Sequence, residues 1–320
     1  MSPRYERIPR ALSRRTLLSG ALGMAGAAVL AGCSSGKSAS STSTTGLLSL
    51  SSDSANGNSQ DDYVLLQIFS DGPYVYPGAP QRLAFALANG EGAFLDTGPA
   101  SLEFVVVDGK DRPVGSPITV ALHDKGLQKG YYPLVFDPPA TGDYTAKTSI
   151  KGKPLTAAFQ VFDKSKITAL GAGAAMPSIP TPTVADHQGV DPICTASPQC
   201  PFHTVSLDAA LKAAKPVAVL IATPAYCQTA ICGPVLDVLV SQKAAFGERI
   251  TLIHNEVYKS GAIASKNISA PGNLTPLIAA MKLEFEPTLV LVNADGTIKG
   301  RLDNVFDQTE AAAALNSLAG

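Results

Sequence analysis

The sequence predicts a multidomain protein in which an all-β sandwich is followed by an α/β domain with a mixed sheet. Two observations carry this prediction. Between residues 62 and 163, short apolar runs alternate with turn residues at intervals typical of an antiparallel sandwich. After residue 203, helical periodicity alternates with short buried runs, which is the pattern of an α/β structure.

Residues 1–32 have the composition of an export signal. Five arginines, the last of them Arg15, precede an apolar run that is too short and too rich in glycine to span a membrane. The segment from Ser13 to Leu18 resembles the twin-arginine export pattern, although secretion through the general route stays open. Leu30-Ala31-Gly32-Cys33 resembles a bacterial lipobox, which implies that a lipid on Cys33 anchors the protein to the extracytoplasmic face of the cell membrane.

The mature chain is predicted to be acidic and tethered. Without residues 1–32, which hold five arginines and one glutamate, 20 basic and 25 acidic residues remain, a net charge of about −5. This balance argues against nucleic acid as a partner. Residues 33–61 are mostly Ser, Thr, Gly and Asn with little to bury, so we expect a disordered tether there.

Seven strands are expected in the β-sandwich, residues 62–163. Gly142-Asp143-Tyr144 resembles the corner of immunoglobulin-like domains, in which the tyrosine hydroxyl bonds back to the backbone. The resemblance implies an immunoglobulin-like fold, and a spacer role is favoured over presentation of a partner because no reactive side chains cluster here. The expected strands are 63–70, 81–88, 101–108, 118–122, 131–136, 142–150 and 155–162.

A linker rich in glycine and proline, residues 164–190, leads into the α/β domain, residues 191–320. The sequence pattern of this α/β domain predicts four helices, two single strands and a hairpin that turns at Asp295-Gly296. The expected helices are 206–214, 235–246, 274–283 and 308–318, and the expected strands are 217–222, 250–255, 288–292 and 297–302.

The last domain resembles the thioredoxin-like superfamily. A cysteine, Cys227, follows a buried strand and precedes a helix, and Glu286-Pro287-Thr288 opens a later strand that continues into a hairpin. The resemblance implies a redox-active Cys227 and a cis proline at Pro287 that faces it. The chain departs from the family's pattern because four residues, rather than two, separate Cys227 from Cys232.

That spacing constrains the local structure. In one regular helix the two Cα atoms would lie about 8.6 Å apart, whereas a disulfide needs less than about 7 Å. We therefore expect the regular helix to begin at Pro234, with both cysteines in the preceding loop. A helix N-terminus stabilises a thiolate, so Cys227 is the predicted nucleophile and Cys232 the resolving cysteine. Asp237 could accept a proton there, but a favourable partner for the helix dipole is the preferred interpretation.

Three alternatives remain for the cysteines. The segment around Cys227 and Cys232 also resembles peroxiredoxins with the same spacing, without the arginine those enzymes place beside the thiolate. Cys194 and Cys200 are predicted to form a structural disulfide rather than a redox relay. With His203 and His254 the cysteines could instead form a copper or zinc site in a non-catalytic scaffold, but the spacings match no structural zinc pattern, and no metal or other cofactor is predicted.

His123 and His187 are expected at the surface.

Taken together, these features predict a membrane-tethered thiol-disulfide oxidoreductase. Its catalytic residues would be Cys227, Cys232 and Pro287. Because an exported protein meets an oxidising compartment, the predicted partners are the thiols or disulfides of other exported proteins, together with the membrane that holds the lipid on Cys33.

Overall fold

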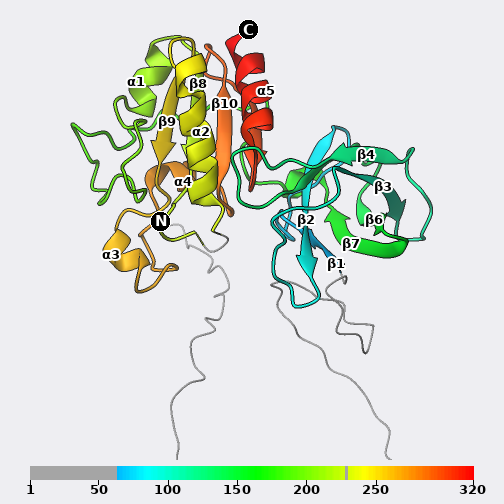
Figure 1. Ribbon diagram of the computed structural model, residues 1–320. Coiled ribbons are helices and arrows are strands. Elements are labelled where there is room, and N and C mark those ends of the chain that lie inside the picture. The colour runs from blue at the N-terminus through cyan, green and yellow to red at the C-terminus, as the bar shows by residue number, and fades with distance from the viewer. Residues whose placement is uncertain (1–62, 228–229) are drawn as a thin grey trace, which may run out of the picture. The chain divides into compact units, whose positions relative to one another are not determined.

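The structure is a computed structural model that describes residues 63–227 and 230–320. The predicted signal peptide, the lipidation site at Cys33 and the predicted tether lie outside the described residues. The described chain is a mixed α/β protein with several antiparallel sheets and few helices (Figure 1). None of the helices in this described part is long and apolar enough to cross a membrane.

Seven antiparallel strands form two sheets in the first part of the described chain. One sheet has the order β1-β2-β5 and the other the order β4-β3-β6-β7. The seven strands expected from the sequence are confirmed, with small differences at their ends. Their bounds are β1 Tyr63–Gln67, β2 Gln81–Asn89, β3 Ser101–Asp108, β4 Ile118–Ala121, β5 Tyr132–Phe136, β6 Gly142–Ile150 and β7 Lys153–Val161.

The two sheets share one apolar core, because alternate residues along each strand point to the same face. At its centre, the rings of Phe85 on β2 and Phe104 on β3 stack with their centroids 5.5 Å apart. Near the start of β6, Tyr144 donates its hydroxyl proton to the carbonyl oxygen of Ala140 over 2.9 Å. This is the bond to the backbone expected from the Gly142-Asp143-Tyr144 sequence.

The segment between the β strands and the α/β part begins with a short 3-10 helix, η1 (Lys164–Lys166). Farther along, the N–H groups of Gly173 and Met176 donate to the carbonyl oxygens of Ile298 and Gly296, over 2.9 Å each. Met176 is buried in the core of the α/β part. The predicted linker is therefore hydrogen-bonded to the second half of the chain over part of its length.

The α/β part contains a four-stranded mixed sheet of order β11-β10-β8-β9. Strand β8 runs parallel to β9 and antiparallel to β10, and β10 forms a hairpin with β11. The expected strands and helices are confirmed, and one short helix, α3, is additional. Their bounds are α1 Leu207–Lys212, β8 Val217–Ile221, α2 Cys232–Phe246, β9 Thr251–Asn255, α3 Gly261–Ala264, α4 Pro276–Met281, β10 Thr288–Val292, β11 Ile298–Asp303 and α5 Gln308–Ala319.

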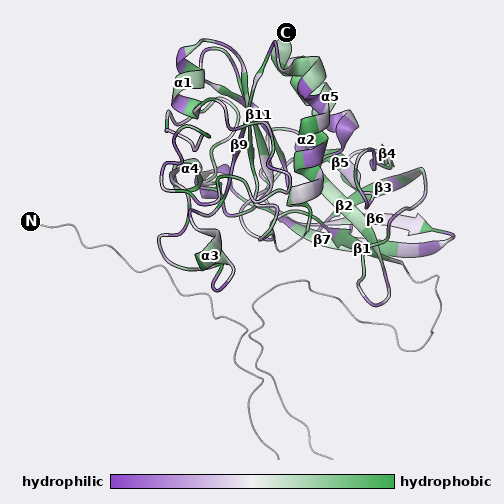
Figure 2. Ribbon diagram, turned by 60° about the vertical axis from the view of Figure 1, so that its left-hand side comes forward, coloured by the Kyte–Doolittle hydropathy of each residue, from purple (hydrophilic) through white to green (hydrophobic). Residues whose placement is uncertain are grey.

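Helices cover both faces of the mixed sheet (Figure 1). On one face, α2 and α5 pack on alternate residues of β8 such as Ala218 and Leu220. On the other face, α1 and α4 pack on Val219 and Ile221. Since both faces are covered, all five residues of β8 are buried. Figure 2 shows hydrophobic and hydrophilic residues interspersed along α2 and α5, as expected for helices with one side on a core.

Helix α2 begins at Cys232, so the expectation that the regular helix starts at Pro234 is wrong. The N–H of Val235 already donates to the carbonyl oxygen of Ile231, over 3.0 Å. Pro234 is tolerated in the first turn because the N–H that proline lacks would have no partner within the helix. Cys232 therefore lies inside the first turn, and Cys227 lies in the loop before it.

A partly buried ion pair joins the β strands to the α/β part. Nη2 of Arg82, on β2, lies 2.6 Å from Oε2 of Glu310 on α5. Tyr131 donates a hydrogen bond to the same carboxylate, and the N–H of Asp307 donates to the Tyr131 hydroxyl over 2.9 Å. The contact thus combines charge with directional hydrogen bonds in a partly desolvated setting.

Candidate functional site

Cys227 and Cys232 lie where β8 ends and α2 begins. Cys227 is half-buried in the loop after the strand, whereas Cys232 is the first residue of the helix and is fully buried. A hydrogen bond connects the two thiols. The N-terminus of α2, whose unpaired N–H groups favour negative charge, thus lies at the buried Cys232, five residues after Cys227.

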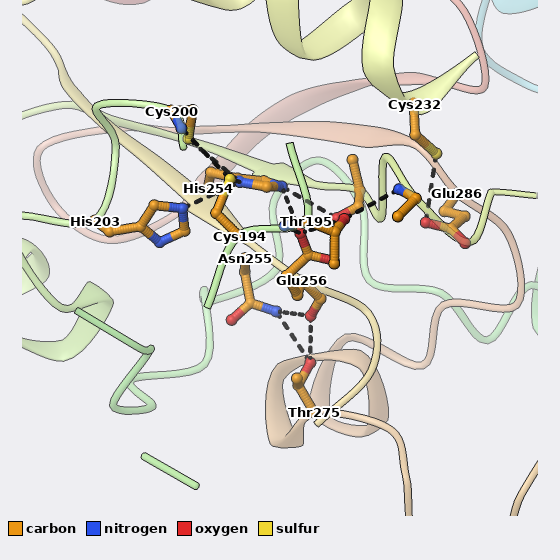
Figure 3. Close-up of polar contacts among 12 residues, drawn as sticks. Cys194, Thr195, Cys200, His203, Cys232, His254, Asn255, Glu256, Thr275 and Glu286 are labelled. Carbon is orange, nitrogen blue, oxygen red and sulfur yellow. Dashed lines mark hydrogen bonds and ion pairs between the residues drawn. The ribbon is translucent and has the colours of Figure 1, made fainter. Parts of the chain in front are cut away.

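Glu286 completes this site from the turn that precedes β10. The thiol of Cys232 donates to Oε2 of Glu286, with 3.5 Å between sulfur and oxygen (Figure 3). The peptide bond between Glu286 and Pro287 is cis, as the resemblance to thioredoxin-like proteins implied for Pro287. Burial raises the pKa of Glu286 to about 8, and the negative charge of Cys227 adds to this shift. The carboxyl group can therefore gain or lose a proton near neutral pH.

The environment of Cys232 keeps its thiol protonated. Burial raises the pKa of Cys232 well above its ordinary value, and the hydrogen bond with Cys227 and the charge of Glu286 raise it further. A base must therefore remove the proton before Cys232 can attack. Asp237 is exposed on α2 and lies beyond its first turn, so it is neither a buried proton acceptor nor the first-turn partner of the helix dipole that the sequence suggested.

A second group of four side chains lies in the same part of the chain. Cys194, Cys200 and His203 come from the segment before α1, and His254 comes from β9. Their exposed fractions are 7%, 7%, 1% and 0%. One sulfur or nitrogen atom from each side chain lies within 4.8 Å of the other three, so this group could hold a metal ion.

His254 contacts the other three side chains of this group. Its Nδ1 lies 3.7 Å from Sγ of Cys194, 3.4 Å from Sγ of Cys200 and 3.2 Å from Nε2 of His203 (Figure 3). Its other ring nitrogen, Nε2, lies 3.1 Å from the carbonyl oxygen of Ala222. Because a carbonyl oxygen only accepts, Nε2 carries the proton and Nδ1 presents a lone pair to the other three side chains.

The two cysteine groups are linked through Thr195 and Glu256. The hydroxyl of Thr195 donates to Oε1 of Glu256 over 2.9 Å and accepts from the N–H of Ala225 over 3.1 Å. The N–H of Thr195 also donates to Oε1, over 2.6 Å. Glu256 is buried, and burial raises the pKa of its carboxyl group. These bonds hold the residue after Cys194 against the loop that carries Cys227.

The four cysteines in the described part of the chain are free thiols. A disulfide between Cys194 and Cys200 stays a prediction, since this structure presents the reduced pair. A hydrogen bond from Cys200, aided by His203 and His254, lowers the pKa of Cys194, and the same contact raises the pKa of Cys200. Of the two cysteines, Cys194 is therefore the one that more readily becomes a thiolate.

A different cluster contains His123, which the sequence placed at the surface. His123 is half-buried, and its Nδ1 lies 3.0 Å from Oδ1 of Asp307, next to Glu310. Both carboxylates already have partners, because Asp307 caps α5 and Glu310 pairs with Arg82. This cluster is a polar contact between the two parts of the chain. His187 is exposed, as expected.

The sequence does not indicate the role of Glu286, and it leaves the placement of His203 and His254 open. In the sequence, Glu286 stands out only as the neighbour of Pro287, although an acidic residue directly before a buried strand can signal a functional carboxyl group. His203 and His254 were considered with the cysteines but are separated by 50 residues, and no metal motif has that spacing. Pairing of β9 with β8 brings His254 to the cysteines, and this pairing cannot be read from local pattern.

A scan against protein-family models finds no match for this chain, and a search of curated proteins finds no significant relative. The geometry of the two cysteine groups is therefore the basis on which a function can be assigned.

Proposed function

We propose that the protein is a membrane-tethered thiol-disulfide oxidoreductase with a thioredoxin-like catalytic domain. Cys227 is the attacking cysteine and Cys232 the resolving one. The observation that carries the proposal is the hydrogen bond from the buried Cys232 thiol to Glu286, beside a half-buried Cys227 in the loop that precedes α2. A nucleophile that clients can reach and a buried thiol with its own base are the two parts that disulfide exchange needs.

The arrangement of elements supports the thioredoxin-like assignment. A parallel β8-β9 pair, an antiparallel β10-β11 hairpin and helices on both faces form a compact mixed sheet. The reactive loop follows the central strand β8, and the cis proline Pro287 opens the neighbouring β10. For the preceding β strands, two facing sheets and the Tyr144 hydrogen bond support an immunoglobulin-like spacer.

In the proposed reaction, the Cys227 thiolate attacks one sulfur of a client disulfide. A bond forms between Cys227 and the client as the client S–S bond breaks, and the other client sulfur leaves as a thiolate. Cys232 then attacks Sγ of Cys227, which releases the second client sulfur. Two electrons pass to the client, and Cys227 and Cys232 finish as a disulfide. The same steps in reverse oxidise a client dithiol.

Glu286 handles the proton of the resolving step. It accepts the proton from Cys232 as that sulfur attacks, and it returns a proton to the departing client thiolate. A pKa of about 8 suits both directions, because the acid and its conjugate base are both present near neutral pH.

The place of action follows from the N-terminal sequence. A lipid on Cys33 would hold the protein on the extracytoplasmic face of the membrane, and the clients would be exported proteins that carry thiols or disulfides. The tether and spacer would then set how far from the membrane the Cys227 site can reach.

The test is reduction of insulin disulfides by the full chain with dithiothreitol as the electron source. We expect Cys227→Ser to abolish the catalysed rate, and Cys33→Ser, a matched cysteine substitution, to leave it intact. Consumption of hydrogen peroxide with a sulfenic acid on Cys227, and no insulin reduction, would identify a peroxidase instead. A Cys227–Cys232 disulfide that resists dithiothreitol would rule out both activities.

A further inference from the structure

The group of Cys194, Cys200, His203 and His254 has a feature that thiol exchange does not use. Four potential ligands converge in a fully buried space, and two are sulfur atoms while two are imidazole nitrogens. Two segments of the chain supply them, since Cys194, Cys200 and His203 lie on the irregular segment before α1 and His254 comes from β9. Bringing them together orders this irregular segment against the sheet.

The distances match those between ligands around one tetrahedral ion. With bonds of about 2.3 Å to sulfur and about 2.05 Å to nitrogen, neighbouring ligands lie about 3.6 Å apart for a sulfur-nitrogen pair and about 3.3 Å apart for two nitrogens. Nδ1 of His254 lies 3.7 Å and 3.4 Å from the two sulfurs and 3.2 Å from Nε2 of His203. These three edges of a tetrahedron are thus already formed.

Hydrogen bonding alone does not account for this convergence. Nε2 of neutral His254 carries the ring proton and donates a hydrogen bond to the carbonyl oxygen of Ala222. Nδ1 therefore carries no proton and has a single lone pair. Three polar atoms face that lone pair, and one strong hydrogen bond uses it up. An ion at the centre would instead engage the lone pairs of all four side chains together.

We infer that Cys194, Cys200, His203 and His254 bind one Zn²⁺ ion in a closed, structural site, in place of the Cys194–Cys200 disulfide that the sequence predicts. Two thiolates and two neutral imidazoles balance the charge of a divalent ion, and tetrahedral sulfur-nitrogen sites select zinc. All four ligands are buried, which leaves no open position for water or substrate, as in structural rather than catalytic zinc sites. Binding releases the protons of the two thiols.

The surroundings orient His254 and the loop of Cys194 as the outer shell of a metal site does. The carbonyl oxygen of Ala222 fixes the tautomer of His254. Glu256, the second residue after His254, holds the backbone N–H of Thr195, next to Cys194, over 2.6 Å. The ligands from β9 and from the loop are therefore tied to each other before any ion binds.

The experiment titrates the reduced, metal-free full chain with Co²⁺ and then with Zn²⁺ under argon. We expect one equivalent of Co²⁺ to produce a thiolate-to-cobalt charge-transfer band with the strong visible absorption of tetrahedral cobalt, and Zn²⁺ to displace it. Cys200→Ser should weaken metal binding at least tenfold. Cys227→Ser, a matched substitution in the other cysteine group, should retain the full signal, which separates this site from the proposed redox function.

Because Cys200→Ser can also impair folding, His203→Cys provides a second variant. It keeps four ligands, so it should still bind Co²⁺, with a stronger charge-transfer band from the third thiolate. Absence of a cobalt-thiolate band in the reduced parent chain would overturn the inference. So would a band that survives in Cys200→Ser with unchanged affinity, or a chain purified from the oxidising compartment with an intact Cys194–Cys200 disulfide and no zinc.

Discussion

Two pairs of cysteines lie at the same end of the mixed sheet, yet their surroundings differ. At Ile221 the end of β8 is paired with Asn255 on β9 and with Thr288 on β10, so residues beyond these ends share one edge. Cys194 and Cys200 face two imidazoles and are closed to solvent. Cys227 is half-buried, and its partner Cys232 faces a carboxyl group.

The comparison indicates that two properties decide the chemistry of a cysteine in this sheet: the side chains that face its sulfur atom and the exposure of that sulfur to solvent. Imidazole nitrogens bring lone pairs to a common centre, which suits a metal ion. A carboxyl group instead takes a proton from a thiol but leaves the sulfur free to form a bond with another sulfur. Exposure adds the second distinction, because Cys227 is half-buried whereas the other three cysteines of the described residues are buried.

The largest expected effect comes from Cys232→Ser, which should separate attack from resolution. Cys227 can still attack a client disulfide, but no second thiol releases the product, so a mixed disulfide accumulates. Non-reducing electrophoresis should show a covalent complex with insulin chains and no multiple turnover. The same band in Cys227→Ser would contradict the assignment of the attacking cysteine.

Removal of zinc should act on stability rather than on sulfur exchange chemistry. At free zinc about 1,000-fold above the dissociation constant, the ion adds about 4 kcal/mol to the free energy of unfolding. Addition of a chelator should then lower the midpoint of thermal unfolding by about 10 °C relative to the zinc-loaded chain. A control without His254 ligation, His254→Ala, should respond little to the chelator, whereas an equal response would place the metal elsewhere.

Glu286→Gln should slow the resolving step about 100-fold, because the base that takes the proton from Cys232 is lost. In the parent chain the rate should rise with pH through about 8, where Glu286 ionises. Stopped-flow release of product from the mixed disulfide measures this step. An unchanged pH profile in the glutamine variant would remove Glu286 from the mechanism.

Stability should depend on pH through the same group. Burial raises the pKa of Glu286 to about 8, above the value of about 4.3 in an unfolded chain, so the folded state holds the proton more tightly. The stabilisation is complete below about 4.3 and is lost as pH rises through about 8. Urea unfolding at pH 5 and pH 8.5 should therefore show a smaller loss in Glu286→Gln than in the parent chain.

The smallest effect is expected for Asp237→Asn. Its side chain is exposed, and Glu286 occupies the position that a proton acceptor for Cys232 needs. The free energy of unfolding should change by no more than about 0.5 kcal/mol, and insulin reduction should keep its rate. A loss of activity comparable with that of Glu286→Gln would show that both acids take part.

Local pattern was sufficient for most of the secondary structure. The seven β strands, the hairpin at Asp295-Gly296 and the helices of the second part follow from periodicity and turn residues. The start of α2 was misjudged because Pro234 marks the first turn of a helix without marking its first residue.

By itself the sequence determined the elements and the loop in which Cys227 lies, because both depend on neighbouring residues. Only the tertiary structure decided which side chains meet. Antiparallel pairing of β10 with β8 places Glu286 beside Cys232, 54 positions away. Parallel pairing of β9 with β8 brings His254 to Cys194 and Cys200. Contacts between distant segments arise from sheet order and register, which hydrophobic periodicity leaves open.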